Sequence, residues 1–114
     1  MEMQEIVRTS LDILFEFKEQ AVKIAGSGAF LDGYIGSLQS GLSRLDDLDT
    51  AEKWVLLGRA HEVLDIVAQE NEMAMMVPGS ALKVAVIRGL QNEIEVAIEG
   101  LDDSRLPGMA WGLG

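Results

Sequence analysis

The sequence predicts an all-α protein: an antiparallel four-helix bundle of two helical hairpins, followed by a short C-terminal tail. Apolar residues make up 48% of the 114 residues but aromatic residues only 5%, so aliphatic side chains and Met must fill the core. Such a core suits packed helices better than a β-sandwich, whose strands favour aromatic and β-branched residues. Apolar residues also recur at steps of three and four along four segments, and turn residues separate these segments.

The first two segments form the first predicted hairpin. The first segment covers residues 2–25, and its inward face is predicted to hold Met3, Ile6, Val7, Leu11, Leu14, Phe17, Ala21 and Ile24. Glycines within residues 26–28 end it. The second segment, residues 29–45, contains Gly33, Gly36 and Gly41, and each glycine costs about 1 kcal/mol relative to Ala in a helix. We therefore expect this helix to be short or bent, with glycines that permit close approach of a neighbouring backbone.

The third and fourth segments form the second hairpin. Asp49 and Glu52 resemble a capping box at the start of a helix over residues 50–76. Its seam is predicted to contain Trp54, Leu57, His61, Leu64, Ala68, Asn71 and Met75, broadened by Val55, Leu56, Val63, Ile66 and Val67. Pro78 and Gly79 break this helix, and Ser80 can cap a fourth one that runs to about Glu99. The predicted inward face of the fourth helix is Leu82, Ala85, Val86, Ile87, Leu90, Ile94, Ala97, Ile98 and Leu101.

The charge of the chain limits its partners. The formal net charge is −10, from 19 acidic and 9 basic residues. Nucleic acid would be repelled, because its binding depends on Lys and Arg displacing counterions, and anionic membranes are disfavoured for the same reason. The least charged window, residues 26–43, is rich in Gly and Ser and too polar to span a membrane. A basic protein is the electrostatically natural partner, although acidity also simply keeps a domain in solution.

The chain contains no cysteine, which excludes disulfides, thiol nucleophiles and thiolate metal sites. This composition is compatible with a reducing cytoplasm. The acidic start, with Glu2 and Glu5, does not resemble a signal peptide. We therefore expect a cytoplasmic protein.

His61 is the only histidine and the first candidate for chemistry. Residues 59–64 lie mid-helix after a helical hairpin, and in this they resemble a histidine-containing phosphotransfer domain, whose phosphoaccepting His lies on an exposed bundle helix. In that family Leu, Lys and Gly follow at the second, third and fourth positions, but here these are Val63, Leu64 and Asp65. The lysine that holds the phosphoryl group is missing. The interpretation we favour is a core or interface histidine with one satisfied nitrogen.

Two pairs of carboxylates suggest a different chemistry. Glu16 and Glu19 lie one turn apart, as do Glu62 and Asp65. An E-x-x-E with an E-x-x-D on packed helices is similar to the magnesium site of all-α nucleotide pyrophosphohydrolases, and the resemblance implies Mg²⁺-dependent hydrolysis. The gap between the pairs is longer than in that family, and no basic cluster is near. With 19 acids, chance pairs are expected, so we favour solvated helix faces.

Other enzyme signatures are absent from the sequence. There is no dinucleotide loop or P-loop, and Gly58 occupies the position that an E-x-x-H di-iron motif would need. Ser and Thr nucleophiles would need a histidine base, and we assign the only one to the helix seam. We therefore predict no catalytic residue, no metal site and no cofactor.

Two features favour a binding role. Met75 and Met76 precede the Pro-Gly break, and flexible Met side chains suit adaptable contact surfaces as well as cores. The tail carries Leu106, Met109 and Trp111 among Gly and Pro residues. A Trp in a non-helical tail is costly to leave in water, so it must pack on its own bundle, on a sister subunit or on a partner.

Together these observations predict a bundle domain over residues 1–100 and a tail over residues 101–114. The expected function is that of a non-catalytic, acidic protein-interaction module, of the adaptor, chaperone, immunity or inhibitor type. Long apolar seams on three helices also favour a homodimer, because two-fold pairing is the commonest homo-oligomer. The magnesium-dependent pyrophosphohydrolase and the degenerate phosphotransfer domain remain the alternatives.

Overall fold

The computed structural model describes residues 2–25, 31–73 and 79–105, and the side chains of 2–19, 31–73 and 79–101. In this part of the chain lie the helices α1 (Met3–Ala25), α2 (Asp32–Ser43), α3 (Thr50–Met73) and α4 (Ser80–Arg105), with the short 3-10 helix η2 (Leu45–Asp47) between α2 and α3. No strand occurs among the described residues, which confirms the predicted all-α fold. None of these helices is long and apolar enough to cross a membrane.

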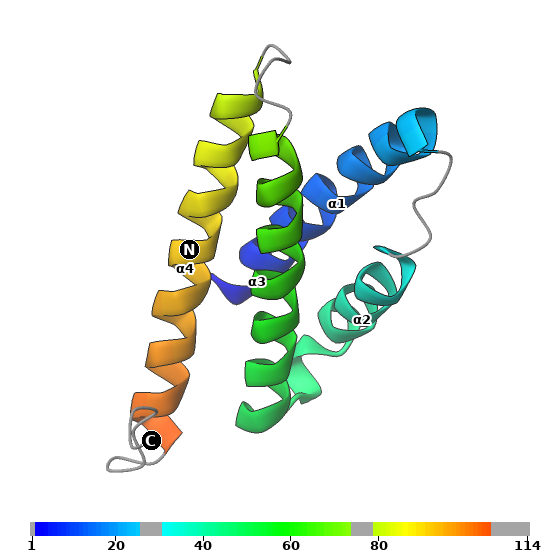
Figure 1. Cartoon of the computed structure of the whole chain (residues 1–114). Helices are drawn as coiled ribbons and strands as arrows, with labels where there is room; N and C mark the ends of the chain where they lie inside the picture. Colours follow the sequence, from blue (N-terminus) through cyan, green and yellow to red (C-terminus); the bar gives the residue numbers. More distant parts are fainter. Residues whose placement is uncertain (1, 26–30, 74–78, 106–114) are drawn as a thin grey trace.

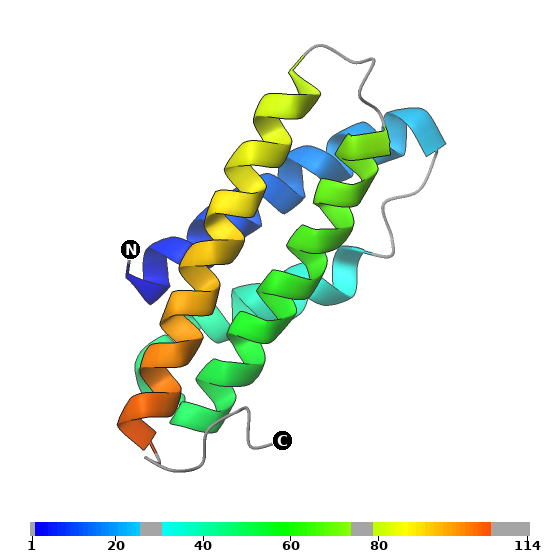
Figure 2. The same cartoon turned by 60° about the vertical axis from the view of Figure 1, so that its left-hand side comes forward.

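The helices form two antiparallel hairpins, α1–α2 and α3–α4 (Figure 1). Helices α3 and α4 lie side by side and make the most extensive helix pairing of the bundle. Helix α1 crosses them obliquely, and in both views its end diverges from the start of α4 (Figures 1 and 2).

One apolar core joins the four helices, and aliphatic side chains make it up as predicted. Its buried members are Ile6, Val7, Leu11, Leu14, Leu31, Ile35, Leu38, Leu56, Leu57, Ala60, Val63, Leu64, Val67, Ala68, Ile87, Leu90 and Ile94. Burial of one Leu or Ile side chain contributes about 1.5–3 kcal/mol, so this cluster supplies most of the stabilisation of the bundle.

One helix end differs clearly from the prediction. Helix α4 continues to Arg105 instead of ending near Glu99. Gly100 lies inside α4 and does not adopt a positive φ angle, which among the described residues only Gly79 does. The next residue, Leu101, still packs against the core. Helix α2 is described only from Asp32 to Ser43, with η2 after it, so the glycine-rich segment is short as expected. The predicted stop at residues 26–28 lies outside the described residues.

The capping box at the start of α3 is confirmed. The Glu52 backbone N–H donates to Asp49 Oδ1 at 2.8 Å, and the Asp49 backbone N–H donates to Glu52 Oε1 at 3.1 Å. These two bonds satisfy donors that a helix N-terminus leaves without an intrahelical partner. At the start of α4, Gly79 has a φ of +87°, which favours glycine directly before Ser80.

One of the three glycines of α2 lies at a close helix contact. An ideal Cβ on Gly41 would lie 2.5 Å from Leu56 Cδ1 and 3.1 Å from Leu56 Cγ. The same Cβ on Gly33 or Gly36 would meet nothing within 4 Å. The close contact at Gly41 is therefore with the Leu56 side chain of α3, and not with a neighbouring backbone as expected.

The predicted inward faces of α3 and α4 are partly wrong. Leu82, Ala85 and Val86 are exposed, although their spacing assigned them to the core. The core side of α4 instead contains Ile87, Leu90, Gln91 and Ile94. At 100° per residue, Ala85 lies on the side of α4 opposite these core residues, and Leu82 and Val86 lie well away from their centre. Val55 of α3 is likewise exposed, because the core face of α3 is centred on its neighbours Leu56 and Leu57.

Candidate functional site

The residues predicted to contact a partner are not part of the described structure. Met75 and Met76 fall between α3 and α4, and Leu106, Met109 and Trp111 follow α4, all outside the described residues. Their role therefore stays a prediction. Met73, the last described residue of α3, is exposed.

The structure contains an apolar groove that the sequence analysis did not identify. The groove has a volume of about 200 Å³ and lies between α1 and α4, with α3 contributing to its floor. Apolar side chains dominate its lining, which consists of Ile13, Glu16, Phe17, Val67, Asn71, Leu82, Lys83, Val86 and Ile87. We refer to these residues as the α1–α4 groove.

The α4 wall of the groove is open to solvent. Leu82 is 70% exposed and Val86 is 53% exposed. On one rim, Lys83 Nζ lies 3.4 Å from Glu16 Oε1 and joins the two walls. On the floor, the Asn71 side-chain amide donates to the Val67 carbonyl of its own helix at 2.9 Å. The floor therefore presents chiefly apolar surface to an occupant.

Glu16 is the one acidic side chain in the lining of this groove. Asp12 and Glu16 are exposed on α1, next in sequence to the groove residues Ile13 and Phe17, and Glu70 is exposed on α3 next to Asn71. The cation that lines the groove, Lys83, is already paired with Glu16. The acid and the base of the lining are therefore paired with each other.

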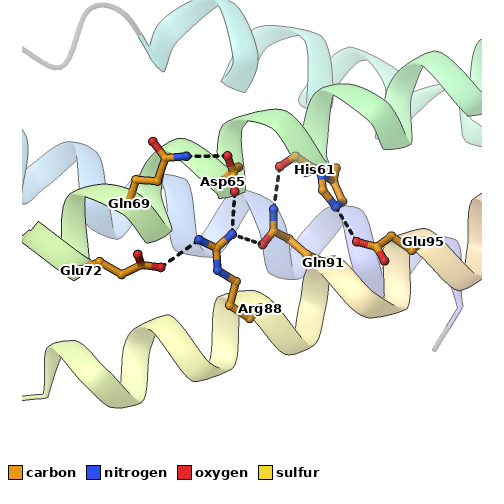
Figure 3. Close-up of polar contacts among 7 residues, drawn as sticks. All are labelled: His61, Asp65, Gln69, Glu72, Arg88, Gln91 and Glu95. Atoms are coloured by element: carbon orange, nitrogen blue, oxygen red, sulfur yellow. Dashed lines mark hydrogen bonds and ion pairs between the residues drawn. The ribbon is translucent and has the colours of Figure 1, made fainter.

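A polar strip joins α3 and α4 at a separate place (Figure 3). Arg88 Nη1 donates to Asp65 Oδ1 at 2.5 Å and to Gln91 Oε1 at 2.8 Å, and Arg88 Nη2 donates to Glu72 Oε1 at 2.8 Å. Gln91 is buried, and its Nε2 donates to the His61 backbone carbonyl at 3.1 Å. The strip thereby fixes the register of the α3–α4 hairpin.

The electrostatics of this strip follow from Arg88. The hydrogen bond from the Arg88 guanidinium lowers the pKa of the Asp65 carboxyl, and partial desolvation opposes the shift. The same hydrogen bond, together with the one to Glu72, raises the pKa of Arg88. Both groups stay charged at neutral pH, so the strip is a structural ion-pair network.

His61 lies at the contact between α3 and α4. Its Nε2 is 2.9 Å from Glu95 Oε2, and its side chain is 34% exposed (Figure 3). It is therefore an interface residue with one ring nitrogen satisfied. A phosphoryl group arriving at Nε2 would meet the Glu95 carboxylate, and the nearby Arg88 is held by Asp65 and Glu72.

The two predicted carboxylate pairs have separate partners. Glu16 pairs with Lys83, Asp65 pairs with Arg88, and Glu62 accepts a hydrogen bond from the Tyr34 hydroxyl at 3.1 Å. The bond to Glu62 raises the pKa of the Tyr34 hydroxyl. Across the described ranges, no group of three or more His, Asp or Glu side chains is arranged to hold a metal ion. The structure thus does not bring the four carboxylates together.

Comparison with known proteins adds no further evidence. No family model, curated protein or solved structure matches this chain.

The groove escaped the sequence analysis because helical spacing does not show which partner covers an apolar face. One signal was present. The apolar arc of α4 that begins with Leu82, Ala85 and Val86 is wider than the core-facing arc that a bundle helix needs. An excess of this kind indicates a second contact surface on the same helix.

Proposed function

We propose that the protein is a non-catalytic, acidic interaction module that binds a basic protein partner in the α1–α4 groove. The observation that carries this proposal is the groove itself, an apolar cleft open to solvent through Leu82 and Val86 in a chain with a net charge of −10. An adaptor, a chaperone, an immunity protein or an inhibitor would each use such a surface.

The size of the groove favours a side chain over a small molecule. Pockets for small ligands typically enclose about 300–1,000 Å³ and place several polar groups toward the ligand. The groove encloses about 200 Å³, and the amide of Asn71 on its floor is turned to its own helix. One or two apolar anchors from a partner helix suit this shape, in the way that amphipathic helices bind grooves.

The charges around the groove favour a basic partner. Glu16 lines the groove, and the exposed acids Asp12 and Glu70 are next in sequence to the groove residues Ile13 and Asn71. A partner helix that places apolar side chains at steps of three and four in the groove would present Lys and Arg on its flanks to these acids. Such charge complementarity speeds association and selects the partner, while the apolar contact provides most of the affinity.

The first experiment uses a peptide of Leu and Lys with helical spacing, added to the isotope-labelled full chain and followed by NMR. We expect chemical-shift changes centred on residues 13–17 and 82–87, weakening as salt is raised. A matched peptide with Glu in place of Lys is the control and should bind at least tenfold more weakly. Equal binding of both peptides, or shifts centred on another surface, would contradict the proposal.

A pair of matched variants tests the position of the site. Val86 on the groove wall is 53% exposed and Val55 on α3 is 54% exposed, so neither substitution to Glu buries a charge. Val86→Glu should weaken binding of the Leu–Lys peptide at least tenfold, because it places a carboxylate in the apolar contact. Val55→Glu should leave binding unchanged. The same effect from both variants would remove the groove from the proposal.

The proposal also includes a homodimer and a location in the cytoplasm. The absence of cysteine from the chain supports a reducing compartment. A dimer needs a surface that two acidic chains can share, and a candidate lies on the outward side of α4.

A further inference from the structure

The outward side of α4 carries a second apolar surface. Leu82, Ala85, Gly89, Asn92 and Val96 recur along this side, and all five are exposed. Val96 is 65% exposed, and Leu82, at the border with the α1–α4 groove, is 70% exposed. None of the five is charged, and we call them the α4 face.

The glycine at the centre of this surface has no evident role in the single chain. A Cβ on Gly89 would meet nothing within 4 Å. Glycine in the interior of a helix costs about 1 kcal/mol relative to Ala. Its advantage is that another backbone can approach closely, and any such approach to Gly89 would come from outside the chain.

We propose that two copies of the chain associate through the α4 face, with their α4 helices antiparallel and the two-fold axis at Gly89. Position 89 lies midway between 82 and 96 and between 85 and 93. In this register Leu82 of one copy packs on the partner's Val96, and the larger side chains surround a centre made of two glycines. A two-fold interface must be self-complementary in this way.

The absence of charge from the α4 face favours a second copy over a basic partner as the occupant. Two chains of net charge −10 repel one another, so they associate where the contact itself carries no charge. A basic partner would find no acid among the five residues of the α4 face. Glu93, which borders this face and is partly buried, would lie opposite the partner's Ala85, so the register does not place the two Glu93 carboxylates opposite each other.

The dimensions of the face predict a weak dimer. At about 1.5 Å per residue, positions 82 and 96 are about 21 Å apart, and a helix with its side chains is about 10 Å wide. The resulting footprint of about 200 Å² per copy is well below the roughly 800 Å² per partner of standard interfaces. We therefore expect a reversible dimer that forms as the protein concentration rises.

The chain lacks cysteine, so single cysteines report the register without background. If the helix axes are 8–10 Å apart, the two Cα atoms at position 89 are about 3–5 Å apart, which overlaps the distance range of a disulfide. Gly89→Cys should therefore form a disulfide-linked dimer readily. Gly58→Cys is the control, because Gly58 is also exposed in mid-helix, on α3, and should cross-link at least tenfold more slowly.

A mixture of two variants tests the antiparallel direction. Leu82→Cys and Val96→Cys should cross-link when mixed, and neither should cross-link alone. Cross-linking of either variant alone, or equal rates for Gly89→Cys and Gly58→Cys, would overturn the proposed register.

Analytical ultracentrifugation tests the association without any cross-link. The full chain should change from monomer to dimer with concentration, Val96→Glu should shift the dissociation constant at least tenfold, and Val55→Glu should not. A chain that stays monomeric up to millimolar concentration would overturn the proposal. These experiments contain no peptide, so a negative result would not count against binding in the α1–α4 groove. Conversely, failure of the peptide to bind would not count against the dimer.

Discussion

Helix α2 offers the same substitution at two positions with opposite expected effects. Gly36→Ala adds a methyl group that meets nothing within 4 Å, so it should stabilise the fold by about 0.5–1 kcal/mol through helix propensity. Gly41→Ala gains the same stabilisation from helix propensity, but its Cβ would lie 2.5 Å from Leu56 Cδ1. Overpacking of this kind costs about 1–3 kcal/mol, so the net effect should be a destabilisation of about 0.5–2 kcal/mol.

Urea denaturation of the two variants and the parent chain measures both effects. The transition midpoints should move in opposite directions, with the slope unchanged if the denatured state is unaffected. A third comparison isolates the cause: in a Leu56→Ala background, Gly41→Ala should become stabilising, because the methyl group then fills the space that Leu56 leaves. If Gly41→Ala stabilises the parent chain as much as Gly36→Ala does, the close contact between α2 and α3 is refuted.

Three further predictions concern stability. Asp49→Ala should lower the free energy of unfolding by about 1 kcal/mol, measured by urea denaturation, because it removes the side-chain cap of α3. Leu64→Ala should cost about 2–5 kcal/mol in the same assay, because Leu64 is fully buried and its truncation leaves a cavity. The lowered pKa of Asp65 means that its contribution is present above the ordinary carboxyl pKa and is lost as the pH falls through the lowered value. Thermal unfolding between pH 6 and 2 should therefore be less pH-dependent in Asp65→Asn than in the parent, and an identical profile would contradict the role given to Arg88.

The sequence predicted the helices because their signals are local. The capping box at Asp49 and Glu52 depends on atoms three residues apart, and the structure contains both of its hydrogen bonds. The break before Ser80 depends on a backbone angle that glycine adopts readily, and Gly79 adopts it. Apolar spacing likewise identified Ile6, Leu14, Leu57 and Ile94 as core residues.

The sequence could not predict the groove, because the groove depends on how one helix crosses two others. The spacing of Leu82 and Val86 is that of a buried face, but in the structure both are exposed and line the groove between α1 and α4. The end of α4 was missed for a related reason. Gly100 is a common stop signal, but the contact of Leu101 with the core favours continuing the helix.

The ion-pair and hydrogen-bond partners of the charged residues could not be predicted from the sequence either. Spacing alone made Asp65 a possible metal ligand, whereas in the structure its partner is Arg88, on the neighbouring helix. His61 was expected at a helix seam and does lie at one, but its hydrogen bond to Glu95 could not be derived from one helix alone.

The central claim is that the α1–α4 groove holds an apolar side chain of a basic helix, and intermolecular nuclear Overhauser effects test it most directly. With the Leu–Lys peptide bound, the peptide leucine methyl groups should show cross-peaks to the Phe17 ring and to the methyl groups of Val67 and Ile87, which line the groove. Cross-peaks to Val55 in place of these residues, or a saturated complex with none to the groove, would contradict the claim.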